Sequence, residues 1–226
     1  MIRKLIAAAA LALTAPALAA EDMPDVRIIL VGNLLTDAAS NPSGPATITT
    51  SGGKITDIAQ GWTAPSAPEP HVTVIDLKDK TVLPGLIDLH VHLTGDPGGD
   101  FWKRAVEPTE WGVVVGAKNA RLTAKAGFTT VREAGSSQYS AFSLRRGTAE
   151  GKIPGPRIVA AGPALAIVGG HGDTTGFKED INEALSSGYS CTGTNECAMK
   201  VRRASRAGSD IIERKRVVEG QRVDEW

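Results

Sequence analysis

The sequence after Pro84 alternates between short runs rich in β-branched residues and longer stretches with helical character, and this alternation constrains the fold most. Strands are predicted at 86–93, 128–133, 157–162 and 209–212, and helices at 109–125, 139–150 and 194–206. Consecutive parallel strands need a crossover connection, which is usually a helix. The sequence therefore predicts an α/β fold with a parallel sheet in this part of the chain.

The segment before Pro84 shows short strands broken by turns instead. Strands are predicted at 26–31, 46–50 and 72–77, a hairpin connection at 51–54 and a proline-containing loop at 62–70. We expect this segment to form a small antiparallel sheet.

The first residues are typical of a secretory leader. Arg3 and Lys4 give a positively charged start, an unbroken apolar run covers 5–13, and small residues follow at 17–20. The apolar run is shorter than the roughly 20 residues that a membrane-spanning helix needs. We expect residues 1–20 to be a signal peptide, and the mature chain to be periplasmic or secreted without a membrane span. A buried N-terminal helix is the alternative.

The charge of the chain limits the partners that it can bind. Lys and Arg together number 25, as do Asp and Glu, so the formal net charge is zero. Nucleic acid and anionic lipid attract proteins through positive charge. The composition therefore argues against a nucleic-acid partner, and a small neutral or zwitterionic substrate fits better.

Two cysteines, Cys191 and Cys197, lie near an expected helix start. An oxidising compartment allows a disulfide between them, although the geometry of a helix start can prevent one. The C-x5-C spacing is not a zinc signature. The sequence therefore leaves two alternatives, a disulfide between these residues or two unpaired structural cysteines.

The strand predicted at 86–93 carries three polar residues on one face. Alternate residues of a strand point the same way, so Asp88, His90 and His92 share a side. Two imidazoles at i and i+2 can reach one cation, with Zn–N distances of about 2.0–2.1 Å, and Asp88 is placed to orient a ligand. Polar side chains on an apolar strand are costly to bury without partners. We therefore predict a metal site; satisfied core or surface histidines are the alternative.

Four motifs, in order, resemble the amidohydrolase superfamily. The segment VLPGLIDLHVHL at 82–93 is similar to its first barrel strand, and AGFTTVRE at 126–133, GPRI at 155–158 and GGHGD at 169–173 follow. Together they resemble the imidazolonepropionase-like branch, which includes exported peptidases acting on Xaa-Pro dipeptides. The resemblance covers the mature chain up to Ile212.

This resemblance implies a (β/α)8 barrel with a small β-sandwich built from sequence flanking the barrel. Residues 21–82 would form part of the sandwich, and residues 83–212 a partial TIM-type barrel of about four βα units. Family members hold one or two divalent metal ions, usually zinc, which activate a water molecule near neutral pH. The implied activity is hydrolysis of a C–N bond in a small-molecule or dipeptide substrate.

Carried over residue by residue, His90 and His92 match the histidine ligands of the family's first strand. Glu213 stands where the family has a carboxylated lysine, so it is a candidate ligand; alternatively, it begins an unrelated tail at 213–226. The remaining ligands and the catalytic aspartate belong to later strands. A full barrel takes about 250 residues, so we expect a C-terminally truncated, inactive or weakly active version.

The Gly-rich connection at 163–190 carries His171 and is longer than a structural link requires. In the family this loop lies near the barrel mouth, so His171 is a candidate substrate-binding residue; a solvated loop histidine is the alternative. Glu133 ends the second barrel strand, where family members more often have aspartate. A structural hydrogen bond is expected from it.

Three interpretations follow from these residues. The chain is a metal-dependent amidohydrolase, an inert metal-binding or interaction protein on a partial barrel, or a non-functional gene product. A nucleophilic serine is not supported, because no Gly-x-Ser-x-Gly motif is present. Metal analysis together with a hydrolysis assay would separate the first two.

Overall fold

The computed structural model describes residues 25–37, 39–98, 103, 106–137 and 139–215. The expected signal peptide at 1–20 and most of the expected tail at 213–226 lie outside these residues. The chain divides after Pro84 into two units, which are described separately. No helix in the described ranges is both long and apolar enough to cross a membrane.

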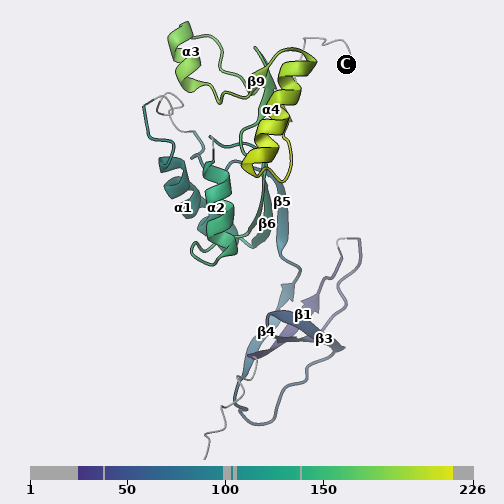
Figure 1. Ribbon diagram of the computed structural model, residues 1–226. Helices are drawn as coiled ribbons and strands as arrows, with labels where there is room; N and C mark the ends of the chain where they lie inside the picture. The colour runs from purple at the N-terminus through teal and green to yellow at the C-terminus, as the bar shows by residue number, and fades with distance from the viewer. Residues whose placement is uncertain (1–24, 38, 99–102, 104–105, 138, 216–226) are drawn as a thin grey trace, which may run out of the picture. The chain divides into compact units, whose positions relative to one another are not determined.

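The first unit is a four-stranded sheet with the strand order β3-β2-β1-β4 (Figure 1). Its strands are β1 (Val26–Leu34), β2 (Ala46–Ser51), β3 (Lys54–Gln60) and β4 (Val72–Val82). The pairs β1–β2 and β2–β3 are antiparallel, as predicted. The prediction is wrong for β4, which runs parallel to β1. The connection at 61–71 explains this, because it is long enough to carry the chain across the sheet to the far edge.

The hairpin predicted at 51–54 is confirmed. Gly52 and Gly53 form its turn with φ values of 57° and 75°, and Ser51 pairs with Lys54 across it. Two successive residues in the left-handed region are what a two-residue type I′ turn needs, and glycine adopts that conformation without strain. The register of β2 and β3 is therefore determined locally.

The β-sandwich implied for this segment is seen as one layer, since residues 25–84 form a single sheet. A small core stabilises it, consisting of Val31, Leu34, Ala46 and Ile48. On the edge strand β3, Ile55 and Ile58 remain exposed.

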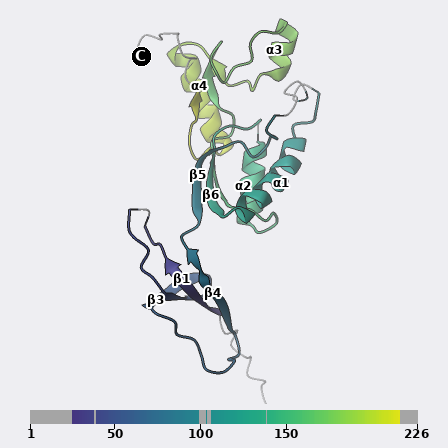
Figure 2. The same cartoon turned by 180° about the vertical axis from the view of Figure 1, so that it is seen from behind.

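The second unit begins with a parallel three-stranded sheet in the order β5-β6-β7. The strands are β5 (Leu86–Val91), β6 (Phe128–Glu133) and β7 (Arg157–Ala160), and the connecting helices are α1 (Trp111–Lys125) and α2 (Ser140–Ala149). Both helices lie on the same side of the sheet in the two views of Figures 1 and 2. The predicted alternation of strand and helix around a parallel sheet is confirmed here.

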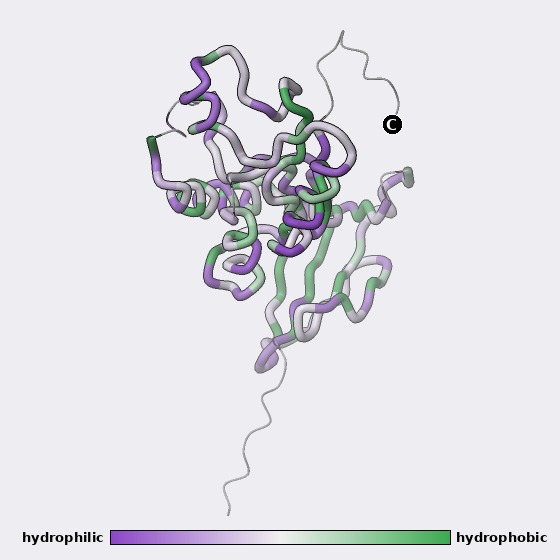
Figure 3. Tube along the Cα trace, turned by 45° about the horizontal axis from the view of Figure 1, so that its top comes forward, coloured by the Kyte–Doolittle hydropathy of each residue, from purple (hydrophilic) through white to green (hydrophobic). Residues whose placement is uncertain are grey.

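The helices α1 and α2 approach closely because Gly116 leaves room for Leu144. A Cβ atom on Gly116 would lie 2.8 Å from Cδ2 of Leu144. Leu144 is fully buried, and the core around it includes Leu93, Ala120, Val131, Ala141, Phe142, Ile158 and Ala160. Along the helices, hydrophilic and hydrophobic segments alternate (Figure 3), as expected when one helix face packs on a core.

The chain beyond β7 forms a second parallel sheet in the order β10-β8-β9. Its strands are β8 (Leu165–Ile167), β9 (Ser190–Cys191) and β10 (Arg214–Lys215), while α3 (Glu179–Leu185) follows β8 and α4 (Gly193–Ala207) follows β9. The Gly-rich connection at 163–190 therefore contains short elements of its own. Gly208 ends α4 in the left-handed conformation, with φ of 105°.

The strand predicted at 209–212 is wrong. The chain bends there. The N–H of Asp210 donates to the carbonyl of Ala160, and its carboxylate accepts hydrogen bonds from Arg145 of α2 and from the backbone N–H of Ala160. Regular pairing starts only at Arg214, opposite Leu165. The sheet that begins with β5 therefore contains three strands among the described residues, one fewer than predicted for 83–212.

Replacing Leu144 with alanine is expected to lower the free energy of unfolding by about 2–5 kcal/mol, because it opens a cavity at a fully buried position. Urea unfolding followed by circular dichroism measures this change. Ser143→Ala is the matched control, since Ser143 is exposed on the same helix and should change stability by less than about 0.5 kcal/mol. Equal stability of the two variants would contradict this description of the core.

Candidate metal centre

A β-bulge in β5 presents His90 at the carboxyl end of the sheet. Asp88 pairs with Val131 of β6. The next pair is Val91 with Glu133. Leu89 and His90 of β5 therefore lie opposite the single residue Arg132 of β6. The regular alternation predicted for 86–93 is therefore interrupted between Asp88 and Val91.

Two side chains fix this bulge by binding backbone groups within it. The carbonyl of Leu89 accepts a hydrogen bond from Nε of Arg132 at 2.5 Å. The N–H of His90 donates to Oδ1 of Asp88 at 2.9 Å. The role of Asp88 in orienting a ligand stays a prediction; its carboxylate accepts the backbone N–H of His90. Asp88 thus holds the backbone of His90 in place.

The imidazoles of His90 and His92 lie beside one another, as the sequence predicted. Their ring centroids are 5.2 Å apart and their planes meet at 77°. His90 is exposed, and the side chain of His92 is 50% exposed. Both rings are therefore accessible at the edge of the sheet where β5 ends.

Gly135, in the loop after β6, orients His92. Its carbonyl oxygen lies 2.9 Å from Nδ1 of the ring. A carbonyl can only accept, so Nδ1 carries the proton and Nε2 keeps a lone pair that can bind a metal ion. A Cβ atom on Gly135 would lie 3.3 Å from Cε1 of His92, so the absence of a side chain allows this close approach.

Glu133, at the end of β6, is the residue whose place in the site the sequence did not reveal. Its side chain is fully buried, and Oε2 accepts the backbone N–H of Leu93 at 2.6 Å, which confirms the expected structural hydrogen bond. Oε1 lies 3.8 Å from Nδ1 of His92 and has no hydrogen-bond partner. Burial raises the pKa of the Glu133 carboxyl to about 7, although the backbone N–H groups of Leu93 and Gly135 oppose the shift.

The sequence signals for Glu133 were its position as an acidic residue at the end of a predicted strand, and the family resemblance that implied a structural hydrogen bond there. That pattern indicates a strand end, where a charged side chain is ordinarily solvated. Its carboxylate is held by the backbone N–H of Leu93, which lies 40 positions earlier in the sequence. The strand pattern alone therefore could not predict it.

The other candidate residues do not complete a metal-binding group. Within the described ranges, no three His, Cys, Asp or Glu side chains lie close enough together to hold an ion. Glu213 lies beside β8, where its backbone carbonyl accepts the N–H of Leu165, and His171 is exposed on its loop. The histidine pair thus fits a metal site as two of its ligands, and the described residues add no third.

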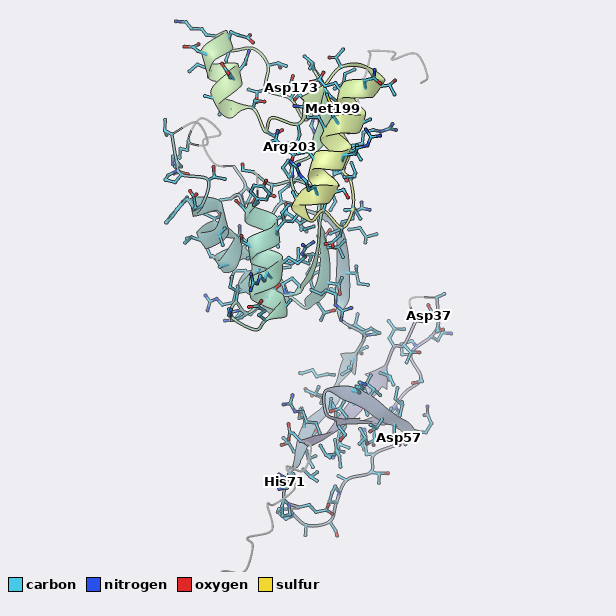
Figure 4. The ribbon with its side chains drawn as sticks, in the orientation of Figure 1. Asp37, Asp57, His71, Asp173, Met199 and Arg203 are labelled. Atoms are coloured by element: carbon cyan, nitrogen blue, oxygen red, sulfur yellow. A yellow bond between two sulfur atoms is a disulfide. The ribbon has the colours of Figure 1, made fainter. Side chains whose placement is uncertain are left out.

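Asp173 closes the loop that carries His171. Its carboxylate accepts the N–H of Gly169 at 2.8 Å and the hydroxyl of Ser190 at 2.6 Å. Burial raises the pKa of Asp173, but these hydrogen bonds outweigh it and lower the pKa overall. Figure 4 labels Asp173 on this loop. The loop is therefore tied to β9.

A disulfide joins Cys191 of β9 to Cys197 of α4, with 5.1 Å between the Cα atoms. The sequence left a bridge and two unpaired cysteines open, and the structure has the bridge. Arg203, labelled in Figure 4, adds a second link, since its guanidinium lies 5.3 Å from the ring centroid of Tyr189. The helix α4 is thus fastened to β9 and the residue before it.

The model of the amidohydrolase family matches residues 81–222. This range covers more than half of the chain and includes the bulged strand β5 and both histidines. The protein therefore belongs to the amidohydrolase family.

Two solved structures, a dipeptidase and a prolidase, are similar to this chain. A Xaa-Pro dipeptidase with methionine bound in its active site is 32% identical, with a TM-score of 0.70 over 83% of this chain and 46% of that one. A prolidase complexed with N-methylphosphonate-L-proline is 25% identical, with a TM-score of 0.67 over 84% of this chain and 46% of that one. The chain thus spans less than half the length of these structures.

Curated relatives match over a shorter range. A dihydroorotase of Syntrophus aciditrophicus is 37% identical over 76 residues, which are 34% of this chain and 17% of the relative. A dihydroorotase of Bacillus thuringiensis is 39% identical over 79 residues, 35% of this chain and 14% of the relative. This likeness therefore concerns a small part of those enzymes.

Glu133→Gln is expected to stabilise the protein above neutral pH more than below it. The pKa of the Glu133 carboxyl is about 7 in the fold against an ordinary 4.5, so the folded state keeps a proton that the unfolded state loses between these values. The stability from this group is complete below about pH 4.5 and falls by roughly 3 kcal/mol as the pH rises through about 7.

Urea unfolding of both proteins at about pH 5 and about pH 8 measures this difference. Between the two pH values, the free energy of unfolding of the variant should rise relative to that of the native chain, because glutamine has no proton to lose. If the variant and the native chain differ in free energy of unfolding by the same amount at both pH values, the raised pKa of Glu133 is contradicted.

Proposed function

We propose that this chain carries the first two ligands of a metal-dependent amidohydrolase that hydrolyses a C–N bond in a small amide or dipeptide. The observation that carries the proposal is the pair of imidazoles, 5.2 Å apart between centroids, at the end of a parallel strand. In parallel α/β folds, functional sites form where the carboxyl ends of the strands meet.

The residues of this chain would hold the cation and orient its ligands. His90 and His92 are the proposed ligands, the carbonyl of Gly135 keeps the proton of His92 on Nδ1, and Arg132 with Asp88 fixes the bulge beneath His90. When bound, a divalent cation lowers the pKa of a coordinated water molecule and polarises a carbonyl group. Imidazole nitrogen suits zinc well, so one or two zinc ions are proposed.

We further propose that β5, β6 and β7 are the first strands of a (β/α)8 barrel, and that the first unit is one layer of a flanking β-sandwich. The parallel order of the strands, with both helices on one side, supports the barrel. The match to the Xaa-Pro dipeptidase over 83% of this chain supports it as well. Later strands of such a barrel would add the remaining ligands and a catalytic aspartate.

The proposed substrate class follows from the relatives with solved structures. One is a Xaa-Pro dipeptidase with an amino acid bound, and another is a prolidase complexed with a phosphonate derivative of proline. The exposed histidine pair would be accessible to a small molecule of this kind, and the net charge of zero offers no field for nucleic acid.

Export to the periplasm or the cell exterior is proposed for the mature chain. The charged start, apolar run and small residues of the first 20 positions support it. The disulfide between Cys191 and Cys197 supports it independently, since disulfides persist in oxidising compartments.

A second candidate function is inert metal binding or an interaction role without catalysis. It is favoured by one observation, namely that the described residues bring no third ligand to the histidine pair. Zinc bound without turnover would be its signature.

Zinc titration tests the metal centre. The mature chain from residue 21 onward should bind Zn²⁺, and His90→Ala or His92→Ala should each weaken binding by at least about tenfold, because each removes one imidazole ligand. Isothermal titration calorimetry gives the affinities. His71→Asn is the control, because His71 lies in the first unit and its φ of 63° is one that asparagine tolerates. Unchanged binding in both ligand variants would refute the site.

Hydrolysis of Xaa-Pro dipeptides by the zinc-loaded chain tests the reaction. Proline release that disappears in His90→Ala and persists in His71→Asn supports the amidohydrolase. Tight zinc binding with no release of proline supports the inert alternative instead.

A further inference from the structure

Glu133 is an unexpected residue to find in the core. It is among the largest fully buried side chains of the described residues, together with Leu144, Val31 and Val131. A buried carboxyl is costly unless hydrogen bonds compensate. Among the described residues, Oε2 accepts the N–H of Leu93 and Oε1 accepts no hydrogen bond. An apolar side chain of similar volume would fill the position at lower cost. Packing alone therefore does not explain this residue.

The unpartnered oxygen lies on the side of His92. Oε1 is 3.8 Å from Nδ1 of the ring, and the carbonyl of Gly135 is 2.9 Å from the same nitrogen. Nδ1 thus faces a carbonyl acceptor and a nearby carboxyl oxygen. Both favour a proton on this nitrogen, which leaves the lone pair on Nε2.

The same carboxyl group also holds the backbone beside the ring. Oε2 accepts the N–H of Leu93, the residue after His92, at 2.6 Å. Leu93 is buried in the core between the sheet and the helices. The backbone that leaves β5 therefore cannot rotate without breaking a buried hydrogen bond. One side chain controls both the position of His92 and the surroundings of its Nδ1.

We propose that Glu133 is a positioning residue for His92: it holds the His92–Leu93 backbone and favours the proton on Nδ1, so that Nε2 is presented to a divalent cation. The inference rests on the proposed role of His92 as a ligand. Loss of a carboxylate that orients a metal-bound histidine typically lowers metal affinity by about 10- to 100-fold.

Two substitutions separate positioning from packing. Glu133→Leu fills the volume with apolar atoms, so the fold should remain intact or gain stability, while Zn²⁺ affinity should fall by about 10- to 100-fold. Glu133→Gln keeps an oxygen for the Leu93 N–H and should lose less affinity. Ser136→Ala is the control, since it removes another buried oxygen without a partner in the loop after β6 and should leave zinc affinity unchanged. A folded Glu133→Leu variant that binds zinc like the native chain would overturn the inference.

The ¹⁵N chemical shifts of the His92 ring, measured without metal, provide a readout independent of zinc. The native chain should carry the proton on Nδ1, bound to the carbonyl of Gly135. In Glu133→Leu the backbone at Leu93 loses its hydrogen bond, so the ring should leave the Gly135 carbonyl part of the time and show a mixture of the two tautomers. Unchanged shifts in that variant would overturn the inference. If the native chain binds no zinc, the proposed function fails, and the tautomer comparison still decides whether Glu133 positions His92.

Discussion

The parallel pairing of β6 with β5 on one side and β7 on the other is the constraint on which the candidate site depends. Because the strands run in the same direction, Val91, Glu133 and Ala160 become neighbours at one edge of the sheet. The groups that hold the chain around His92 come from this edge. The contact from His92 to Gly135 spans 43 positions of the sequence, and that from Leu93 to Glu133 spans 40.

The features with strong local signals were the ones that the sequence predicted best. The strand at 128–133 was located correctly, because a run of β-favouring residues follows Gly127, whose φ of 96° ends the preceding helix turn. The hairpin at 51–54 was predictable for the same reason, since two glycines determine its turn. The side-by-side placement of His90 and His92 followed from their spacing, although a bulge rather than regular alternation produces it.

The features that depend on distant contacts were the ones that the sequence did not predict. At 209–212, the carboxylate of Asp210 binds Arg145 of α2, a contact that no local pattern at Asp210 could indicate. The direction of β4 depends on where a long loop delivers the chain. The buried carboxylate of Glu133 binds the N–H of Leu93, 40 positions away in the sequence. In each case a tertiary contact overrides the local preference of the chain.

The two sides of the His92 ring are in different environments. Behind the ring, a fully buried Glu133 and the backbone of Gly135 form a surface with little solvent, where electrostatic effects are strong. In front, the ring is half exposed and can exchange water for a ligand. A fully solvated histidine would change tautomer freely, and a fully buried one could not reach a cation. The core around Leu144 contributes the stability that offsets the burial of Glu133. The His92 ring, at the edge of the sheet, is therefore held through Nδ1 from inside the fold, while Nε2 remains accessible.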